Sequence, residues 1–270
     1  MIPCLFFAAF GLLMGSFLNV CIVRLPLGES VVRPRSHCRQ CGAPVAAWDN
    51  IPLLSWVLLR GKCRACGAPV SWQYPLVEAA VCTTFITCCL NFSLGPAVAW
   101  GLLCFLLIGL AVMDAQTLLL PDAFTLPGLL AGLIFSAIRP GLERDDWSGQ
   151  AALRSAGIAL LAAALAASVL LLIAGAYWLV RRRMGMGMGD VKLIAMLAAW
   201  LGLAQAGLVL FLAVIAGALY GVALLLAGRG KSGESSGQLM VPFGTMLCLA
   251  GIYSLFVGER TLHWYLQFFH

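Results

Sequence analysis

A pair of short cysteine repeats is the first group of side chains in this sequence that could do chemistry. The repeats read Cys38-Arg-Gln-Cys41-Gly-Ala-Pro-Val and Cys63-Arg-Ala-Cys66-Gly-Ala-Pro-Val, and they are offset by 25 residues. A Cys-x-x-Cys-Gly turn directs two thiolates toward one point, so two such turns supply the four sulfurs of a closed tetrahedral zinc site. Two dithiols or disulfides are the alternative, but a redox site needs only one pair, and a reducing cytoplasm disfavours lasting disulfides. The repeats therefore predict a structural Zn²⁺ bound by all four cysteines.

A small set of carboxylates adjoining long apolar runs is the second group. Its members are Glu78, Asp114, Asp122 and Asp190. A charge within a membrane helix costs about 2.5–3.5 kcal/mol at the centre and less at the ends, so such residues are candidates for function. Two carboxylates brought together can share one proton and catalyse hydrolysis, one as base and the other as acid.

The same carboxylates also have purely structural interpretations. Asp190 could cap a helix N-terminus, and Asp114 could be a solvated helix end. Asp122, directly after a proline, and Glu78 are more typical of charges at helix starts. The glycines of Gly187-Met-Gly189, just before Asp190, allow close backbone approach, which suits a site that must admit a peptide.

The composition shows what must position these groups. Of 270 residues, 62% are apolar and 10% are charged, and the mean hydropathy is +0.97. An ordinary soluble domain carries roughly 25% charged residues, so these values exclude a soluble globule, a coiled coil and a disordered chain. The net charge of +6 is typical of arginine-rich cytoplasmic loops, and we expect no nucleic-acid partner. The chain is predicted to be an all-α polytopic membrane protein surrounded by lipid.

The apolar runs predict about eight transmembrane helices. The first covers residues 1–23 and reads as a retained span, because it lacks a basic n-region and an evident cleavage site. The others lie at about 75–90, 97–113, 123–138, 151–180, two within 191–227, and 241–257. A small Cys4 zinc-binding module, residues 24–74, separates helices 1 and 2, and residues 75–270 form a seven-helix membrane domain.

The distribution of positive charge predicts the orientation of these spans. Residues 24–74 contain seven Lys and Arg against two acidic residues, so this module is expected on the cytoplasmic side. Arg181-Arg-Arg183 and the loop 228–238 are further cytoplasmic markers. The N-terminus and the C-terminus are then outside, and all four carboxylates lie near the cytoplasmic face.

Two segments of this chain resemble the signatures of type IV prepilin peptidases, a family of bacterial membrane aspartic proteases. They are Asp114 with Pro121-Asp122, and Gly187-Met-Gly189-Asp190-Val-Lys192. The resemblance extends over nearly the whole chain, through Gly15-Ser-Phe-Leu-Asn-Val20, Arg24-Leu-Pro26, Trp48-Asp-Asn-Ile-Pro-Leu-Leu-Ser-Trp56, the cysteine repeats, Tyr74-Pro75 with Glu78, and Pro242-Phe-Gly244. One departure is Thr245, where many members have a second proline or alanine, and no catalytic consequence is expected.

The resemblance implies a specific activity. Such enzymes remove the basic leader from prepilins or pseudopilins of type IV pilus and type II secretion systems, at the cytoplasmic face of the inner membrane. The form with the cysteine module also methylates the new N-terminal amine, with S-adenosylmethionine as methyl donor. The catalytic pair corresponds to Asp114 and Asp190, while Gly187, Gly189 and Lys192, with Glu78 and Asp122, are supporting candidates. The site of the methyl donor and the oligomeric state are not indicated.

The roles within the pair follow from helix electrostatics. Asp190 at a helix N-terminus, near Lys192, is expected to be the ionised base, and Asp114 at a helix C-terminus the protonated partner. Two other functions remain open: a transporter that uses intramembrane carboxylates, and a non-catalytic secretion-system scaffold. A transporter is less consistent with carboxylates at one face and with the absence of mirrored halves.

Overall fold

The computed structural model describes residues 2–144, 148–182, 186–227 and 241–268. Arg183 and the loop 228–238, two of the predicted cytoplasmic markers, lie outside these residues. The chain divides into two compact units, residues 1–109 and residues 110–270, and each is described by itself.

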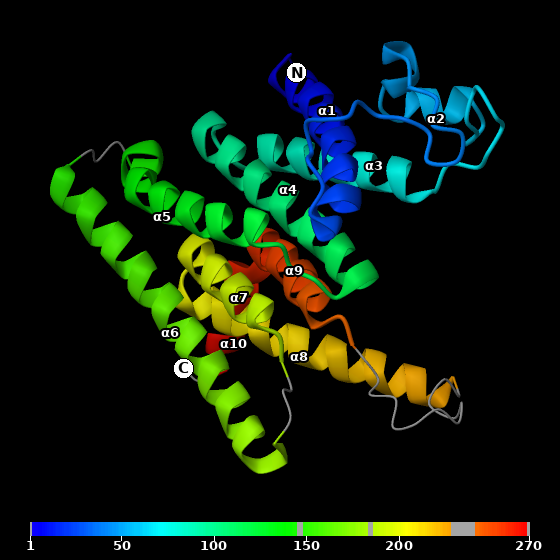
Figure 1. Ribbon diagram of the computed structural model, residues 1–270. Coiled ribbons are helices and arrows are strands. Elements are labelled where there is room, and N and C mark those ends of the chain that lie inside the picture. Colours follow the sequence, from blue (N-terminus) through cyan, green and yellow to red (C-terminus); the bar gives the residue numbers. More distant parts are fainter. Residues whose placement is uncertain (1, 145–147, 183–185, 228–240, 269–270) are drawn as a thin grey trace. The chain divides into compact units, whose positions relative to one another are not determined.

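The first unit contains two packed helices, α1 (Ile2–Arg24) and α3 (Gln73–Asn91), and the start of α4 (Leu94–Thr117). Two glycines one turn apart let α1 and α3 approach closely (Figure 1). A Cβ atom added at Gly11 would lie 2.9 Å from Cys82 Cα, and one added at Gly15 would lie 2.7 Å from Glu78 Cα. A small-xxx-small pattern of this kind is the usual means of close helix packing in membranes.

The segment between α1 and α3 contains little regular secondary structure. It contains the 3₁₀ turns η1 (Leu25–Leu27) and η2 (Ala47–Asn50) and the five-residue helix α2 (Leu54–Leu58). Each cysteine repeat closes on an isolated β-bridge, His37 with Pro44 in the first and Lys62 with Pro69 in the second. The side chain of Arg64 donates two hydrogen bonds to the carboxylate of Asp49, at 2.8 and 2.6 Å, and so fastens the second repeat to η2.

The second unit is built around α7 (Met188–Leu201), which is buried along nearly its whole length. Helices α5 (Asp122–Arg144), α6 (Gly149–Arg181), α8 (Leu203–Leu226) and α9 (Phe243–Tyr253) pack against it (Figure 1). Trp200 fits against the Cα of Gly132, and its indole N–H donates to the carbonyl of Gly128 at 2.8 Å. The chain continues from α9 through the π-helical segment η3 (Ser254–Gly258) into α10 (Glu259–Leu266).

The lengths of the helices test the predicted number of spans. Every predicted apolar run is helical, but among the described residues only α1, α3, α4, α5, α6 and α8 are long and apolar enough to cross a membrane. Helix α7 has 14 residues and rises about 21 Å, short of a hydrocarbon core of about 30 Å. Helix α9 has 11 residues. The structure therefore shows a multi-pass helical membrane protein, and the count of eight spans is not confirmed.

Candidate functional site

Asp114 lies one turn before the end of α4, and the residue is 4% exposed. The backbone N–H of Thr245 donates to its Oδ2 at 2.6 Å, and the Thr245 hydroxyl lies 3.0 Å from the same oxygen. That hydroxyl is also 3.0 Å from the carbonyl oxygen of Ala111. Hydrogen bonds donated to a carboxylate stabilise its charged form, so Thr245 orients Asp114 and offsets part of the cost of burying its charge.

Asp190 is the third residue of α7 and is 9% exposed. It lies outside the six helices that are long enough to cross a membrane. Burial, followed by the charge of Asp114, raises the pKa of Asp190 to about 6, and a backbone hydrogen bond from Gly187 lowers it in part. This direction is opposite to the one that the helix N-terminus and Lys192 predict from the sequence.

The two aspartates, 76 positions apart in the sequence, are brought together in one unit. The Asp114 charge acts on Asp190, and the buried thiol of Cys248 in α9 lies within electrostatic reach of both carboxyl groups. The repulsion between like charges makes it costly for both carboxyls to be ionised at once. The titrations of the two carboxyl groups are therefore coupled.

Two glycines make room for this pair. A Cβ atom added at Gly244 would lie 3.0 Å from Asp114 Cγ and 2.9 Å from Leu120 Cδ1, and one added at Gly189 would lie 2.9 Å from Leu120 Cβ. Leu120 thus fills the space beside both glycines. At Gly187 an added Cβ would make only an ordinary contact with Asp190 Oδ2, at 3.7 Å. Gly189 and Gly244 are therefore the sterically constrained positions.

Lys192 and Asp122, two further candidates, pair with each other. The Lys192 Nζ atom donates to Asp122 Oδ1 at 2.6 Å and so joins the start of α5 to the first turn of α7. Lys192 is not among the groups that shift the pKa of Asp190. Its observed contact is with Asp122, and it holds two helix starts of the site in register.

Glu78 belongs to the other unit. It is 6% exposed, and its Oε2 accepts a hydrogen bond of 2.7 Å from the backbone N–H of Leu53. Leu53 has a positive φ of 59°, an unusual conformation for a leucine, and its N–H is thereby directed at the carboxylate.

The four repeat cysteines converge as their spacing predicts. Their sulfur atoms all lie within 4.8 Å of one another, and Cys38 Sγ is 3.8 Å from Cys66 Sγ. A tetrahedral metal with Zn–S bonds of about 2.3 Å requires sulfurs about 3.8 Å apart. Each turn closes in the same way: the N–H of Gly42 donates to Cys38 O, and that of Gly67 to Cys63 O, with φ of +71° and +72° at the two glycines.

The thiol electrostatics also suit a metal. Backbone N–H groups of Cys41 and Gln40 lower the pKa of Cys38 to about 6. The backbone N–H of Ala68 acts in the same direction on Cys66, but the thiols of Cys41, Cys63 and Cys38 together with burial raise its pKa to about 11. The cluster favours one thiolate and resists further ones until a cation balances them. This arrangement could hold a metal ion.

Thr245 is a functional candidate for which the sequence analysis expected no catalytic consequence, and Gly244 was noted there only as part of the resemblance. Thr245 contacts Asp114 across 131 positions, and no spacing rule predicts such a contact. The only available signal was its departure from the residues that the resemblance led us to expect after Pro242-Phe-Gly244.

Comparisons with known proteins agree with this geometry. Residues 9–92 match the bacterial peptidase A24 N-terminal domain, and residues 101–222 match the type IV leader peptidase family. The prepilin leader peptidase/N-methyltransferase of Aeromonas hydrophila is 35% identical, over 99% of this chain and 96% of its own. The chain belongs to the type IV leader peptidase family.

Other members of this family are similarly close. Prepilin leader peptidase/N-methyltransferases from Stutzerimonas stutzeri and Legionella pneumophila are 36% and 32% identical to this chain. Each comparison covers 96% of this chain, and 92% and 93% of the respective relative. No solved structure matches the chain. The two matched segments separate at residues 93–100, so Asp114 and Asp190 both fall in the leader peptidase match and the four cysteines in the N-terminal one.

The raised pKa of Asp190 predicts a pH-dependent effect on stability. A carboxyl group with a raised pKa in the folded state holds its proton more tightly than in the unfolded chain. Ionisation of Asp190 therefore lowers the free energy of unfolding as the pH rises from about 4 through about 6. Asp190→Asn should therefore stabilise the protein at pH 7.5, by up to about 3 kcal/mol, and change it little at pH 4.5. Unfolding midpoints in detergent measure this, with Glu259→Gln on the exposed start of α10 as control. Equal stabilisation at both pH values would contradict the assignment.

Proposed function

We propose that this chain is a membrane aspartic endopeptidase that removes the basic leader of type IV prepilins or pseudopilins, and that it then methylates the new N-terminal amine. The observation that carries the proposal is the pair of buried, electrostatically coupled carboxyl groups at Asp114 and Asp190. They occur in a member of the leader peptidase family, whose relatives are named for both activities. S-Adenosylmethionine is the methyl donor that this second activity requires.

Proteolysis by such a pair needs one carboxylate and one carboxylic acid. The carboxylate takes a proton from a water molecule placed between the two groups, and the resulting hydroxide attacks the scissile carbonyl carbon. The carboxylic acid donates its proton to the carbonyl oxygen, which gives a tetrahedral intermediate with two hydroxyl groups. The former base then donates the proton it took from water to the leaving amine, and the former acid regains a proton from one of these hydroxyl groups as the C–N bond breaks. The pair is thereby returned to its starting state.

The hydrogen bonds support an assignment of roles within the pair. The backbone N–H of Thr245 donates to Asp114 and offsets part of the cost of burying its charge, whereas burial and the charge of Asp114 raise the pKa of Asp190 to about 6. We therefore assign Asp114 as the base that activates water and Asp190 as the initial acid, the reverse of the order expected from helix dipoles alone. Thr245 acts as a positioning residue, because it touches Asp114 and not the reacting atoms.

The metal at the cysteine cluster is proposed to be a structural Zn²⁺. Four thiolate donors in a closed tetrahedron are the typical zinc set, and they leave no coordination position open for substrate. The segment around the repeats has little regular structure, so metal ligation would supply much of its folding free energy. Cys38, Cys41, Cys63 and Cys66 hold the ion.

The arrangement in the membrane follows the charge pattern. We propose an inner-membrane protein whose cysteine module and paired aspartates face the cytoplasm and whose two termini face outward, in contact with lipid along the exposed apolar helices. We propose residues 23 and 74 as boundaries between functional parts of the chain. They differ from the division between the compact units 1–109 and 110–270, which reflects packing alone.

Substitution of either aspartate tests the proposed function. Asp114→Asn and Asp190→Asn should each reduce cleavage of a detergent-solubilised prepilin at least a thousandfold, because neither variant can supply both a base and an acid. Methylation of an already cleaved pilin should persist in both variants, and Glu259→Gln should match the wild type in both assays. Normal cleavage by either Asn variant would refute the dyad. A wild-type protein that neither cleaves the prepilin nor methylates the cleaved pilin would refute the proposed function.

Thr245 offers a finer test of the mechanism. Thr245→Val keeps the backbone N–H but removes the hydroxyl, so kcat for cleavage should fall about tenfold with KM unchanged, and the pH profile should shift because Asp114 loses one donor. Thr245→Ser keeps the hydroxyl and should show the kcat and the pH profile of the wild type. A fall in kcat with an unmoved pH profile would show that the residue only packs against its neighbours.

Zinc analysis tests the metal proposal. The purified protein should contain one zinc ion per chain, and Cys38→Ser should lose it, whereas Cys4→Ala, in α1 and outside the cluster, should retain it. The Cys38→Ser protein should lose methylation to a greater extent than cleavage, because the cluster and the aspartates lie in different units. Full zinc content in Cys38→Ser would contradict this site.

A further inference from the structure

A pair of cysteines at one end of the N-terminal unit is used neither by the aspartate pair nor by the proposed zinc site. Cys4 Sγ, in the first turn of α1, lies 3.1 Å from Cys89 Sγ, in the last turn of α3, although 85 positions separate the two residues. Both cysteines are partly exposed free thiols in this structure. The contact is therefore a candidate site for a disulfide between two helices.

The packing of α1 on α3 fixes this contact. The helices run antiparallel, because Asn19 Nδ2 donates to Tyr74 O at the start of α3, at 3.1 Å, whereas Cys4 contacts the end of α3. The close backbone contacts at Gly11 and Gly15 lie between these two points. A shift of either helix by one turn would break the glycine contacts, so the packing that joins the helices also keeps the two thiols together.

The geometry around the pair is compatible with a covalent bond. A disulfide needs sulfur atoms about 2 Å apart and Cα atoms within about 7 Å of each other. The glycine contacts bring the two backbones close, and the sulfurs need to approach by about 1 Å, which small side-chain rotations at two helix ends supply. One turn further in, Phe85 packs against Phe7 and Phe10, with ring centroids 6.3 and 5.8 Å apart. These rings hold the helix ends in place.

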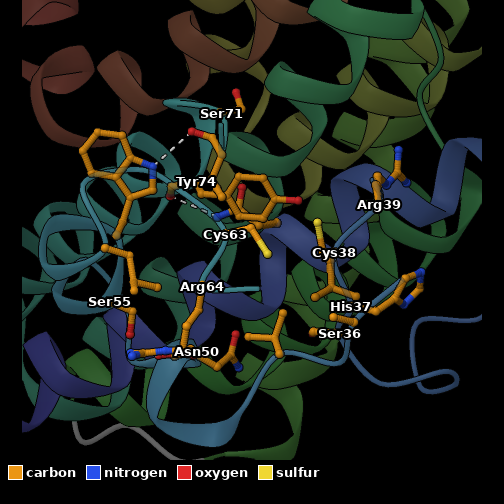
Figure 2. Close-up of a pocket in the computed structure, with 18 of the residues that line it drawn as sticks. Ser36, His37, Cys38, Arg39, Asn50, Ser55, Cys63, Arg64, Ser71 and Tyr74 are labelled. Carbon is orange, nitrogen blue, oxygen red and sulfur yellow. Dashed lines mark hydrogen bonds and ion pairs between the residues drawn. The ribbon is translucent and has the colours of Figure 1, made fainter. Parts of the chain in front are cut away.

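The pair lies at the end of the two helices that is opposite to the cysteine module. At the module end, Tyr74 of α3 lines one cavity together with Cys38 and Cys63 of the two repeats (Figure 2). From Cys4 to Arg24, where the module begins, α1 rises about 30 Å, which is the thickness of a hydrocarbon core. The thiol pair and the module are therefore expected at opposite faces of the membrane.

Polar residues next to the pair mark the boundary with water. Cys89 lies two residues before Asn91, and Asn91 and Ser93 are both exposed where α3 gives way to α4. In the orientation proposed above the module faces the cytoplasm, so this end of the helices faces the periplasm. The periplasm is oxidising, and disulfides form and persist there.

We propose that Cys4 and Cys89 are oxidised to a disulfide that links α1 to α3 at the periplasmic face. The oxidant is a periplasmic protein that carries a reactive disulfide. One cysteine thiolate attacks this disulfide and forms a mixed disulfide, and the second thiolate then displaces the remaining oxidant sulfur. The two cysteines together give up two protons and two electrons, and the oxidant leaves as a dithiol. The inference rests on the proposed orientation and goes beyond the proposed activity.

The bond would close a loop that contains the whole cysteine module. Residues 4–89 lie within this loop, and α1 would stay attached to α3 even when the module has lost its metal. A cross-link over so long a loop stabilises a protein mainly by restricting the unfolded chain. Reduction of the bond should therefore lower the unfolding midpoint of the wild type in detergent by several degrees, and the same treatment should leave the midpoint of Cys4→Ser unchanged.

A second pair of cysteines in the same unit provides an internal comparison. The thiols of Cys88 in α3 and Cys104 in α4 also interact, but both residues are 0% exposed. A protein oxidant cannot reach them, so we expect this pair to stay reduced. The comparison separates accessibility at the periplasmic face from simple proximity of two sulfur atoms.

Thiol trapping in intact cells tests the proposal on the full-length protein. The cells are quenched with acid and N-ethylmaleimide, which blocks free thiols before lysis, and the digested protein is examined by mass spectrometry with and without reduction. Most wild-type chains should yield a peptide pair that joins Cys4 to Cys89 and that reduction separates, whereas Cys88 and Cys104 should carry maleimide. Cys82→Ala, elsewhere in α3, should keep the cross-link, and in Cys4→Ser the thiol of Cys89 should carry maleimide.

Two outcomes of this experiment would overturn the disulfide. One is maleimide on both Cys4 and Cys89 in most wild-type chains, and the other is oxidation of Cys88 and Cys104 to the same extent. If Cys4→Ser fails to fold, the wild type before and after reduction still decides between a bonded and a reduced pair.

The orientation is measured separately, so that the two failures can be told apart. Asn91→Cys and Glu29→Cys, both at exposed positions, are made in a chain that lacks Cys4 and Cys89, and intact cells are treated with a charged maleimide that does not cross the inner membrane. Asn91→Cys should react in intact cells and Glu29→Cys only after lysis. With this labelling, a reduced pair would overturn the disulfide alone. The reverse labelling would overturn the orientation and the disulfide with it, while the proposed peptidase activity would be unaffected.

Discussion

The cost of removing charge from water governs this structure. Most of its surface-exposed side chains on the long helices are apolar, so the fold has little water with which to solvate a buried ionisable group. Among the described residues, three of the four buried charged side chains therefore have a hydrogen bond to a specific partner: Asp114 accepts from Thr245, Glu78 accepts from Leu53, and Arg24 donates to Ser30. These single contacts reduce the desolvation cost without cancelling it, which leaves the groups reactive or ready to bind.

Glycines make these arrangements sterically feasible. Gly15 brings α1 against the backbone of α3 at Glu78, and Gly244 lets α9 begin directly beside the carboxyl of Asp114. Helices in lipid gain little from the hydrophobic effect when they associate, so close van der Waals contact at small residues has a larger share in holding them together. The same glycines thus provide helix packing and space for the polar groups.

The sequence predicted well whatever depends on short-range pattern. The convergence of the four cysteines follows from two turns that repeat at an offset of 25 residues, and the helices follow from apolar runs whose ends carry charge or glycine. The resemblance to prepilin peptidases placed Asp114 and Asp190 as a pair, and the structure brings them into one unit. The side of the membrane on which each loop lies was predicted from charge alone and stays a prediction.

Other features depend on long-range packing and could not be read from the sequence. Thr245 reaches Asp114 over 131 positions, and Lys192 pairs with Asp122 over 70 positions. Burial reversed the direction expected for the pKa of Asp190, since a helix N-terminus stabilises charge by less than the loss of solvent destabilises it. The shortness of α7 likewise reflects how its neighbours enclose it, and hydropathy does not record that.

The exposure of the cysteine cluster has a consequence for the cell. Cys41 and Cys66 are exposed at the surface, so peroxides and other electrophiles can reach two of the four proposed zinc ligands without prior unfolding. Oxidation of one thiolate to a sulfenic acid would weaken the hold on the ion, and a neighbouring sulfur within 4.8 Å could then close a disulfide. Oxidative stress would in this way act on the enzyme through the N-terminal unit, while the aspartate pair, which carries no sulfur, would not be oxidised.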